Sequence, residues 1–448
     1  MDRLDGPNTP QALRLIKLIA RPLRYLDDYG DRYGDIFRVG QSSPPVVYVS
    51  HPDAIQTILT ASPDHFSVGK NGGGRFLRYL MGDDSVLLLD GDRHARQRKL
   101  LMPPFHGDRL RTYSQIMGEI AQEVSDQWQP GQQFRVRAVM QDITLRVILK
   151  AVFGVSEGDR FDHLHQLLSS MMDSLSSPLS ASLIFFPALQ KDWGSLSPWG
   201  RFVRRKEQVD QIIYAEIKDR RAHADEAGDD ILSVLMTARD EDGQPMSDSE
   251  LRDELMTLLI AGHETTASAL TWALYWIHTR PEVEATVRSE LENLGDRLEP
   301  NEITKLPYLN ALCQETLRIY PVTLTTGVRI LSRPLNLMGY ALQPGTVLFP
   351  CIYLVHHRDN LYPDSKSFQP ERFLHRQFSP YEYLPFGGGH RRCIGAAMAM
   401  LEMKLVLATL VANWQFSLAS DRPLKPVRRG ITIAPSSNFK MVAIRRIS

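Results

Sequence analysis

Apolar residues recur every three or four positions through the middle of the chain, which is the spacing of one face of an α-helix. A helical region opens at 94–105, and further helices are predicted over 107–154, 201–240, 249–279, 282–294 and 309–319. Alternation of apolar and polar residues predicts short strands at 35–40 and 45–50, with more around 327–350 and 426–446. The fold class is therefore mainly α with small β-sheets. Without a linker, we expect one domain over 1–448, with a small β-containing lobe over roughly 1–70.

Composition narrows the choice of partners. Lys plus Arg equals Asp plus Glu at 52 each, and without a basic excess we expect no nucleic acid as the main partner. The three cysteines, Cys313, Cys351 and Cys393, are too few for a disulfide framework and fit a reducing, cytoplasmic compartment. Charged residues interrupt the apolar N-terminal stretch, so we expect neither a signal peptide nor a transmembrane anchor.

Two segments leave alternatives open. On the predicted N-terminal helix, Ala12, Leu15, Ile16 and Ile19 form an apolar stripe opposite three cations. A helix docked on its own protein is favoured over one lying on a membrane surface. The loop 176–200 mixes apolar residues with Pro, Ser and Gly, which fits a lid or access channel as well as a loop packed on its own core.

The stretch around Cys393 carries the most specific chemistry. Consecutive glycines allow positive φ and close backbone approach, and a helix rich in Ala, Leu and Met follows Cys393 directly. Unpaired N–H groups and the helix dipole favour the thiolate, which is the metal-binding form. A zinc site would need more ligands than Cys393 and His390. A buried, inert cysteine is the alternative interpretation, and the one we prefer for Cys313 and Cys351.

Phe386, Gly389, Arg391, Cys393 and Gly395 match the pattern F-x-x-G-x-R-x-C-x-G of the cytochrome P450 superfamily. The chain resembles this family over essentially its whole length, most closely soluble bacterial and especially cyanobacterial members. The resemblance implies the cytochrome P450 fold, with haem b (iron protoporphyrin IX) between the long central helix and the Cys-loop helix. It also implies Cys393 as the proximal iron ligand and Arg391 beside a haem propionate.

The long central helix has an unusual polar centre. Gly262 weakens a helix interior, and Glu264 and Thr265 follow it between apolar turns, where polar groups need partners or a function. A threonine hydroxyl can also bond back to the preceding turn and bend the helix. The segment from Ala261 to Thr266 resembles the family's oxygen-binding motif. By that resemblance, Thr265 supports dioxygen by hydrogen bonding and Glu264 helps deliver protons.

Other charged residues are assigned by the resemblance. Glu315 and Arg318 lie three residues apart on a predicted helix, where their side chains can meet. The family match implies that both join Arg372 in a buried structural triad. His94 and Arg98 lie four residues apart on another helix, and these two, with Arg329, occupy places where the family binds haem propionates.

The residues expected to face a substrate are mostly apolar, which suits an apolar molecule, although core packing explains any one of them equally well. Thr323 and Thr325 could orient a carboxylate or hydroxyl. The set comprises Phe76, Leu77, Leu80, Met81, Leu259, Ala261, Val322, Thr323, Leu324, Thr325, Ile431 and Ile433.

The resemblance implies a haem-thiolate monooxygenase, which uses O2 to hydroxylate or epoxidise a fatty acid, alkane, terpenoid or retinoid. No flavin or iron–sulfur motif is present, so we expect a ferredoxin and its reductase to supply electrons. A basic patch would attract an acidic donor, and its candidate members are Arg96, Lys99, Arg391, Arg392 and Lys404. The alternatives are a haem-thiolate isomerase or dehydratase, against which Glu264 and Thr265 argue, and a non-catalytic haem sensor or electron carrier.

Overall fold

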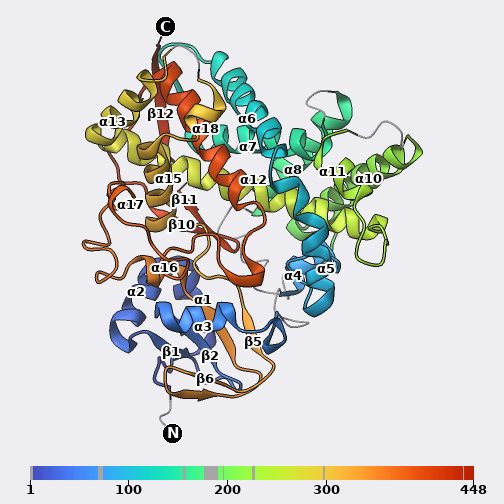
Figure 1. The fold of residues 1–448 in the computed structure, drawn as a ribbon, viewed down its shortest axis with the longest axis vertical. Helices are drawn as coiled ribbons and strands as arrows, with labels where there is room; N and C mark the ends of the chain where they lie inside the picture. Colours follow the sequence, from blue (N-terminus) through green and yellow to red (C-terminus); the bar gives the residue numbers. More distant parts are fainter. Residues whose placement is uncertain are drawn as a thin grey trace.

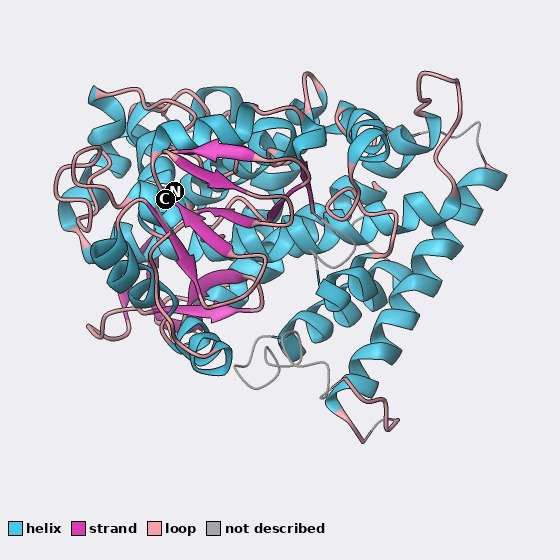
Figure 2. Cartoon of the chain, turned by 90° about the horizontal axis from the view of Figure 1, so that it is seen from below, coloured by secondary structure: helices cyan, strands magenta, loops and turns pink. Residues whose placement is uncertain are grey.

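The computed structural model describes residues 4–68, 74–154, 158–175, 190–194, 196–223, 228–295, 298–436 and 438–447. Figure 1 shows a strand-rich lobe with the N-terminus at one end of the long axis and a helical body with the C-terminus at the other. Seen from below in Figure 2, the strands gather on one side and helices make up most of the rest. The expected fold class, mainly α with small sheets, is confirmed.

One sheet joins early and late parts of the chain. Its strands run in the order β1-β2-β8-β5-β3, and all neighbours are antiparallel except β2 and β8. They are β1 (Ile36–Val39), β2 (Val46–Val49), β3 (Phe66–Ser67), β5 (Arg329–Leu331) and β8 (Val347–Pro350). The helices of this lobe are α1 (Gln11–Ala20), α2 (Pro22–Tyr33), α3 (Pro52–Thr60) and α16 (Ile352–His356).

In the first half of the helical body, two regions that were each predicted as one helix are divided into two. The region 107–154 divides because Gly131 has a φ of +83° and a short strand then pairs with the last strand of the chain. The region 201–240 divides because the Asp230 side chain caps a new helix at the Ser233 amide. The elements are α4 (Gly74–Met81), α5 (Gly91–Leu101), α6 (Arg109–Asp126), β4 (Gln132–Arg135), α7 (Val136–Phe153), α8 (Asp159–Leu175), α10 (Pro198–Ala222) and α11 (Ile231–Thr237).

Helix α12 (Asp248–Thr279) runs through the middle of the body (Figure 1). A capping box starts it: the Glu250 amide donates to Ser247 Oγ at 3.2 Å, and the Ser247 amide donates to Glu250 Oε2 at 2.8 Å. Because buried residues recur along the whole helix, α12 is a core helix.

The remaining elements are α13 (Pro281–Glu292), α14 (Pro300–Ile303), α15 (Pro307–Ile319), β6 (Leu335–Leu337), β7 (Tyr340–Leu342), α17 (Arg372–His375), α18 (Ala396–Asn413), β9 (Trp414–Leu418), β10 (Pro426–Arg429), β11 (Thr432–Pro435) and β12 (Lys440–Arg446). Of these, α13, α15, α18, β9 and β11 contact α12, and the others lie elsewhere in the helical body or in the strand-rich lobe. By length and composition α18 could cross a membrane, but 61% of its residues are buried inside the protein.

The two segments with open alternatives are only partly described. On α1, Leu15 and Ile19 are half-buried whereas Ile16 is exposed, so the predicted stripe docks only in part; the Ala12 side chain lies outside the described residues. Within the loop 176–200, residues 176–189 and 195 lie outside the described residues.

Candidate functional site

The loop before Cys393 is fixed by its own backbone and by α3. Gly387 and Gly389 have φ values of +67° and +64°, which glycine adopts most readily. A Cβ at Gly389 would lie 2.3 Å from the carbonyl oxygen of Leu59, so the loop packs on α3 without room for a side chain. The Cys393 amide donates to the Phe386 carbonyl oxygen at 2.9 Å. These contacts set the place of the thiol.

Cys393 precedes α18 instead of opening it, because the helix begins at Ala396. The residue has accessible surface, yet protein atoms surround the sulfur closely enough that desolvation raises the pKa of the thiol. The Gly395 N–H group, Arg98 and Arg392 lower that pKa without overcoming desolvation. The Gly395 N–H group therefore lowers the pKa as predicted for the helix start, but burial outweighs it. A thiol that coordinates a metal cation gives up its proton.

Basic side chains crowd around this loop: His94 and Arg98 from α5, Arg329 from β5, and His390 and Arg391 from the loop itself. Burial, reinforced by the neighbouring cations, lowers the pKa of His94 to about 3 and that of His390 to about 4. Burial and then Arg391 lower the pKa of Arg329 to about 10. Burial therefore disfavours the positive charges of Arg98, Arg329 and Arg391 unless anions lie beside them.

The protein supplies little negative charge to this cluster. Arg391 donates to Asp90 Oδ1 at 2.7 Å, whereas Arg98 donates to the Arg392 carbonyl oxygen at 2.7 Å. Arg329 is 3% exposed and donates to the adjacent Val328 carbonyl oxygen at 3.0 Å. Among the residues that the structure describes, the one carboxylate that bonds to any of these three guanidiniums is that of Asp90, which leaves room for further anions. A thiol flanked by such donors fits a porphyrin that carries two carboxylates.

In the middle of α12, the backbone packs closely on α7, and a threonine hydroxyl bonds to the preceding turn of the same helix. A Cβ on Gly262 would lie 3.1 Å from Ile148 Cδ1 on α7, which is tight. Thr265 Oγ1 donates to the Ala261 carbonyl oxygen at 2.5 Å, a bond to the preceding turn. Ala261 is exposed while turns on both sides are largely buried. This turn of α12 therefore faces accessible space.

Glu264 is held by two residues of α7 that sequence reasoning missed. The buried Arg137 forms an ion pair with one carboxylate oxygen, and the Gln141 side-chain amide donates to the other at 3.0 Å. Next to it, burial lowers the pKa of His263 to about 4, which keeps that imidazole neutral near pH 7. The sequence signal for Arg137 is a cation at the start of a helix in which most residues are apolar.

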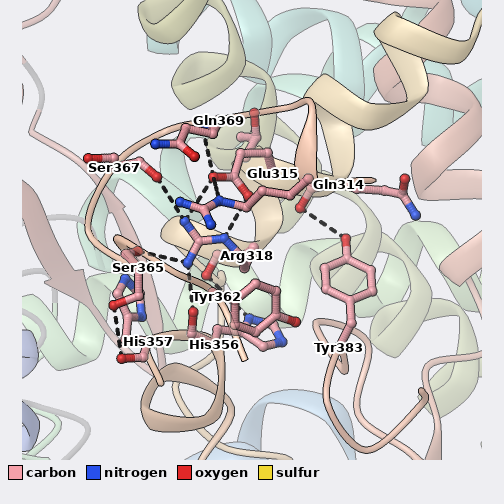
Figure 3. A network of polar contacts seen from close by, with 12 residues as sticks. Gln314, Glu315, Arg318, His356, His357, Tyr362, Ser365, Ser367, Gln369 and Tyr383 are labelled. Atoms are coloured by element: carbon pink, nitrogen blue, oxygen red, sulfur yellow. Dashed lines mark hydrogen bonds and ion pairs between the residues drawn. The ribbon is translucent and has the colours of Figure 1, made fainter. Parts of the chain in front are cut away.

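The three residues predicted as a buried triad lie together: Glu315 pairs with Arg318 (Figure 3), and Arg372 lies within ion-pair distance of Glu315. Arg318 Nε and Nη2 donate to the two oxygens of Glu315 at 2.6 and 2.8 Å, and both side chains are fully buried. Arg372 Nε lies 3.5 Å from Glu315 Oε1. The fork-to-carboxylate geometry is the strong form of such a pair.

The same arginine ties this network to the cysteine loop. Arg318 donates to the carbonyl oxygens of His356, Ser365 and Ser367 at 2.6, 2.8 and 3.1 Å (Figure 3). His356 Nε2 in turn accepts the Leu384 amide at 3.0 Å, close to the start of the loop. The network thereby positions the segment that leads into the thiol.

The predicted substrate-facing residues fall into several environments. On α4, Phe76, Leu80 and Met81 are buried, and Phe76 stacks on Phe202 of α10 with ring centroids 5.7 Å apart. The Ile433 amide donates to the Val322 carbonyl oxygen at 2.7 Å, which joins two of the predicted segments. Leu259 and Ile433 are buried, Ala261 and Ile431 are exposed, and Leu77, Val322, Thr323, Leu324 and Thr325 are half-buried. Their contact with a substrate stays a prediction.

The proposed basic patch is largely neutralised. Arg96 pairs with Asp240 and Glu250, both at 2.6 Å, and Lys99 pairs with Glu241 at 2.8 Å. Lys404 is half-buried and donates to the Thr304 carbonyl oxygen at 3.1 Å, and Arg391 pairs with Asp90. Arg392 is exposed. The five residues therefore do not make a uniformly positive surface.

A family model described as Cytochrome P450 matches residues 6–442. The chain belongs to the cytochrome P450 family. Putative cytochrome P450 135B1 of Mycobacterium tuberculosis is 35% identical over 449 aligned residues, which cover 99% of this chain and 92% of that relative. Putative cytochrome P450 138 of Mycobacterium bovis is 32% identical, with coverage of 98% and 95%.

Solved P450 structures share the fold. Retinoic acid-bound cyanobacterial CYP120A1 aligns with a TM-score of 0.79 and 26% identity over 93% of both chains. The cytochrome P450DA heme domain aligns with a TM-score of 0.85 and 23% identity, over 99% of this chain and 98% of that one, which shows the fold alone. Family membership makes this P450 a haem-thiolate monooxygenase. It binds haem and uses dioxygen, a redox partner and a small-molecule substrate.

Proposed function

We propose that Cys393 is the proximal ligand of haem b, and that Arg98, Arg329 and Arg391, with His94, hold the propionates. The observation that carries this proposal is the cluster of cations around one accessible thiol, matched by Asp90 alone among the described contacts. Phe386, Gly389 and Gly395 shape the loop. Glu315, Arg318 and Arg372 stabilise the core that supports it and have no catalytic role.

With its thiolate ligand, bound haem supplies the activation of dioxygen, so that one oxygen atom enters a C–H or C=C bond and the other leaves as water. We assign to Thr265 the role of forming a hydrogen bond with dioxygen, because its hydroxyl lies on the accessible turn of α12. Glu264 delivers protons. Arg137 and Gln141 each donate to one oxygen of this carboxylate, which leaves a lone pair on each oxygen free to take up a proton.

We also propose an apolar substrate of the fatty acid, alkane, terpenoid or retinoid class. Two observations support this class: the side chains on the predicted substrate side are mostly apolar, and one structural neighbour is a cyanobacterial P450 with retinoic acid bound. An apolar molecule gains binding free energy by burying surface against such side chains.

A ferredoxin with its reductase is our proposed electron donor, in the cytoplasm. Support comes from the sequence, whose 448 residues carry no flavin or iron–sulfur motif. Because Arg96, Lys99 and Arg391 of the predicted basic patch already have acidic partners, charge steering is expected to be modest and to rely on residues such as Arg392.

The test is the spectrum of the reduced, CO-bound protein. We expect the thiolate-type band in the parent protein and in Cys351→Ala, a control that removes a buried thiol away from the loop. Cys393→Ala should lose that band. An unchanged spectrum in Cys393→Ala would refute the ligand assignment.

A further inference from the structure

A charged network joins three helices at the end of α4. Arg252, near the start of α12, has a side chain only 5% exposed. Its Nε donates to Asp210 Oδ1 on α10 at 2.9 Å, and its Nη2 pairs with the same carboxylate. Its Nη1 donates to Asp253 at 2.8 Å and to the carbonyl oxygen of Met81, the last residue of α4, at 3.1 Å. One guanidinium therefore touches α4, α10 and α12.

The segment after α4 is fastened to α12 by its backbone. The Asp84 amide donates to Asp253 Oδ2 at 2.9 Å, and the Val86 amide donates to Glu254 Oε1 at 2.8 Å. Gly82, with a φ of +98°, lies so close that a Cβ would be 2.0 Å from the Asp253 carboxylate. These contacts hold this part of the chain against α12.

Helix α10 meets α4 through side chains instead. Phe76 stacks on Phe202, and Tyr79 lies over Trp199 with ring centroids 5.2 Å apart. Lys206 bonds Asp210 at 2.7 Å, and its ammonium group lies 5.2 Å from the centre of the Tyr79 ring. Aromatic contacts can slide, whereas two guanidinium nitrogens of Arg252 converge on Asp210 Oδ1, and Lys206 donates to Oδ2. These charge-assisted bonds depend more on direction than the aromatic contacts do.

The position of this network relates it to the proposed catalytic site. The chain after Val86 continues to Leu89 and Asp90, both of which bind Arg391 in the cysteine loop. Arg252 also precedes the accessible Ala261 by nine residues on α12, about 14 Å at the helical rise. The network therefore lies where α4, α10 and α12 meet, and the chain leads from it to the cysteine loop and to the accessible turn of α12 at Ala261.

We propose that Arg252 and Asp210 form a latch that holds α10 against α4 and thereby sets how fast bulky apolar molecules enter and leave the catalytic site. This inference rests on the proposed function, because it takes the space beside Ala261 as the substrate side. Both latch residues are positioning residues. The ion pair is mostly shielded from water, so it is weakened less by salt than an exposed pair.

The experiment uses the ferric holoprotein and two nitrogenous probes of different size, imidazole and 4-phenylimidazole, whose binding to haem shifts the Soret band. Stopped-flow absorbance gives association and dissociation rate constants. Asp210→Asn removes the charge at nearly constant shape, and Asp210→Glu keeps it. The matched control is Asp248→Asn, which breaks the exposed α10–α12 pair of Arg221 and Asp248 at 2.7 Å.

We expect Asp210→Asn to raise both rate constants for 4-phenylimidazole roughly tenfold, since hydrogen bonds between charged groups are lost. The rate constants for imidazole should change less than threefold, and Asp210→Glu and Asp248→Asn should stay near the parent protein. A role in fold stability alone would not separate the two probes. Equal rate constants in the parent and Asp210→Asn overturn the latch and leave the haem assignment intact. A parent protein without any Soret shift overturns the proposed function, and the latch with it.

Discussion

Replacing Glu315 with Gln tests the buried network that supports the cysteine loop. In the native protein, Glu315 accepts two bonds from Arg318, lies 3.5 Å from Arg372 and accepts the Gln369 amide at 2.8 Å. Glutamine keeps the size but turns an NH2 group toward the Arg318 donors. Two cations then remain buried with their shared anion removed.

The cost of leaving a buried charge unpaired is about 3–5 kcal/mol, which raises the unfolded fraction roughly a hundredfold to several thousandfold. Urea unfolding followed by circular dichroism should therefore show a lower midpoint for Glu315→Gln, and haem should dissociate at lower urea. The control is Glu302→Gln, which breaks an exposed pair with Lys305 of similar length, 2.6 Å, and should cost at most about 1 kcal/mol. If both variants cost the same, the reasoning on burial is refuted.

Further predictions concern oxygen activation and pH. Thr265→Ala should keep haem and substrate but divert reducing equivalents to peroxide. The control Thr271→Ala also removes a hydroxyl bond to the preceding turn, at 2.7 Å, and should not divert them. Equal product per electron in both variants would contradict the role of Thr265. Burial raises the pKa of Glu402 well above 4.5, so the unfolded state loses this proton first and stability falls as pH rises from 4.5 toward the folded-state pKa. Glu402→Gln should abolish that loss in urea titrations at pH 5 and 6. Burial, followed by repulsion from Arg318, lowers the pKa of His356 from 6.5 to about 3; stability from this group is present above pH 6.5 and is lost as pH falls toward 3. His356→Gln should therefore reduce acid sensitivity between pH 7 and 5 by about 2 kcal/mol, and identical slopes would argue against a neutral buried imidazole.

Local sequence patterns predicted the helices well because each long helix has an apolar face and recognisable ends. The capping box at Ser247 and Glu250 and the stop before Pro281 define α12 without tertiary information. The break between α6 and α7 was missed because β4 exists only by pairing with β12, some three hundred residues away in the chain.

The cysteine motif was predictable since its residue types and spacings are specific, whereas the triad with Arg372 followed only from the resemblance to the family. The electrostatic properties of the site were not predictable from the sequence. The net rise of the Cys393 pKa depends on how closely distant segments enclose the sulfur, which no local pattern reveals. The ion pair of Arg137 with Glu264 and that of Arg96 with Asp240 likewise join residues more than a hundred positions apart.

The central claim is one bond between the Cys393 sulfur and haem iron, and X-ray absorption at the iron edge of the purified holoprotein measures it most directly. A sulfur neighbour should be present in the parent protein and in Cys313→Ser, and absent in Cys393→Ser. An iron surrounded only by nitrogen and oxygen in the parent protein, or a sulfur signal that persists in Cys393→Ser, would contradict the account.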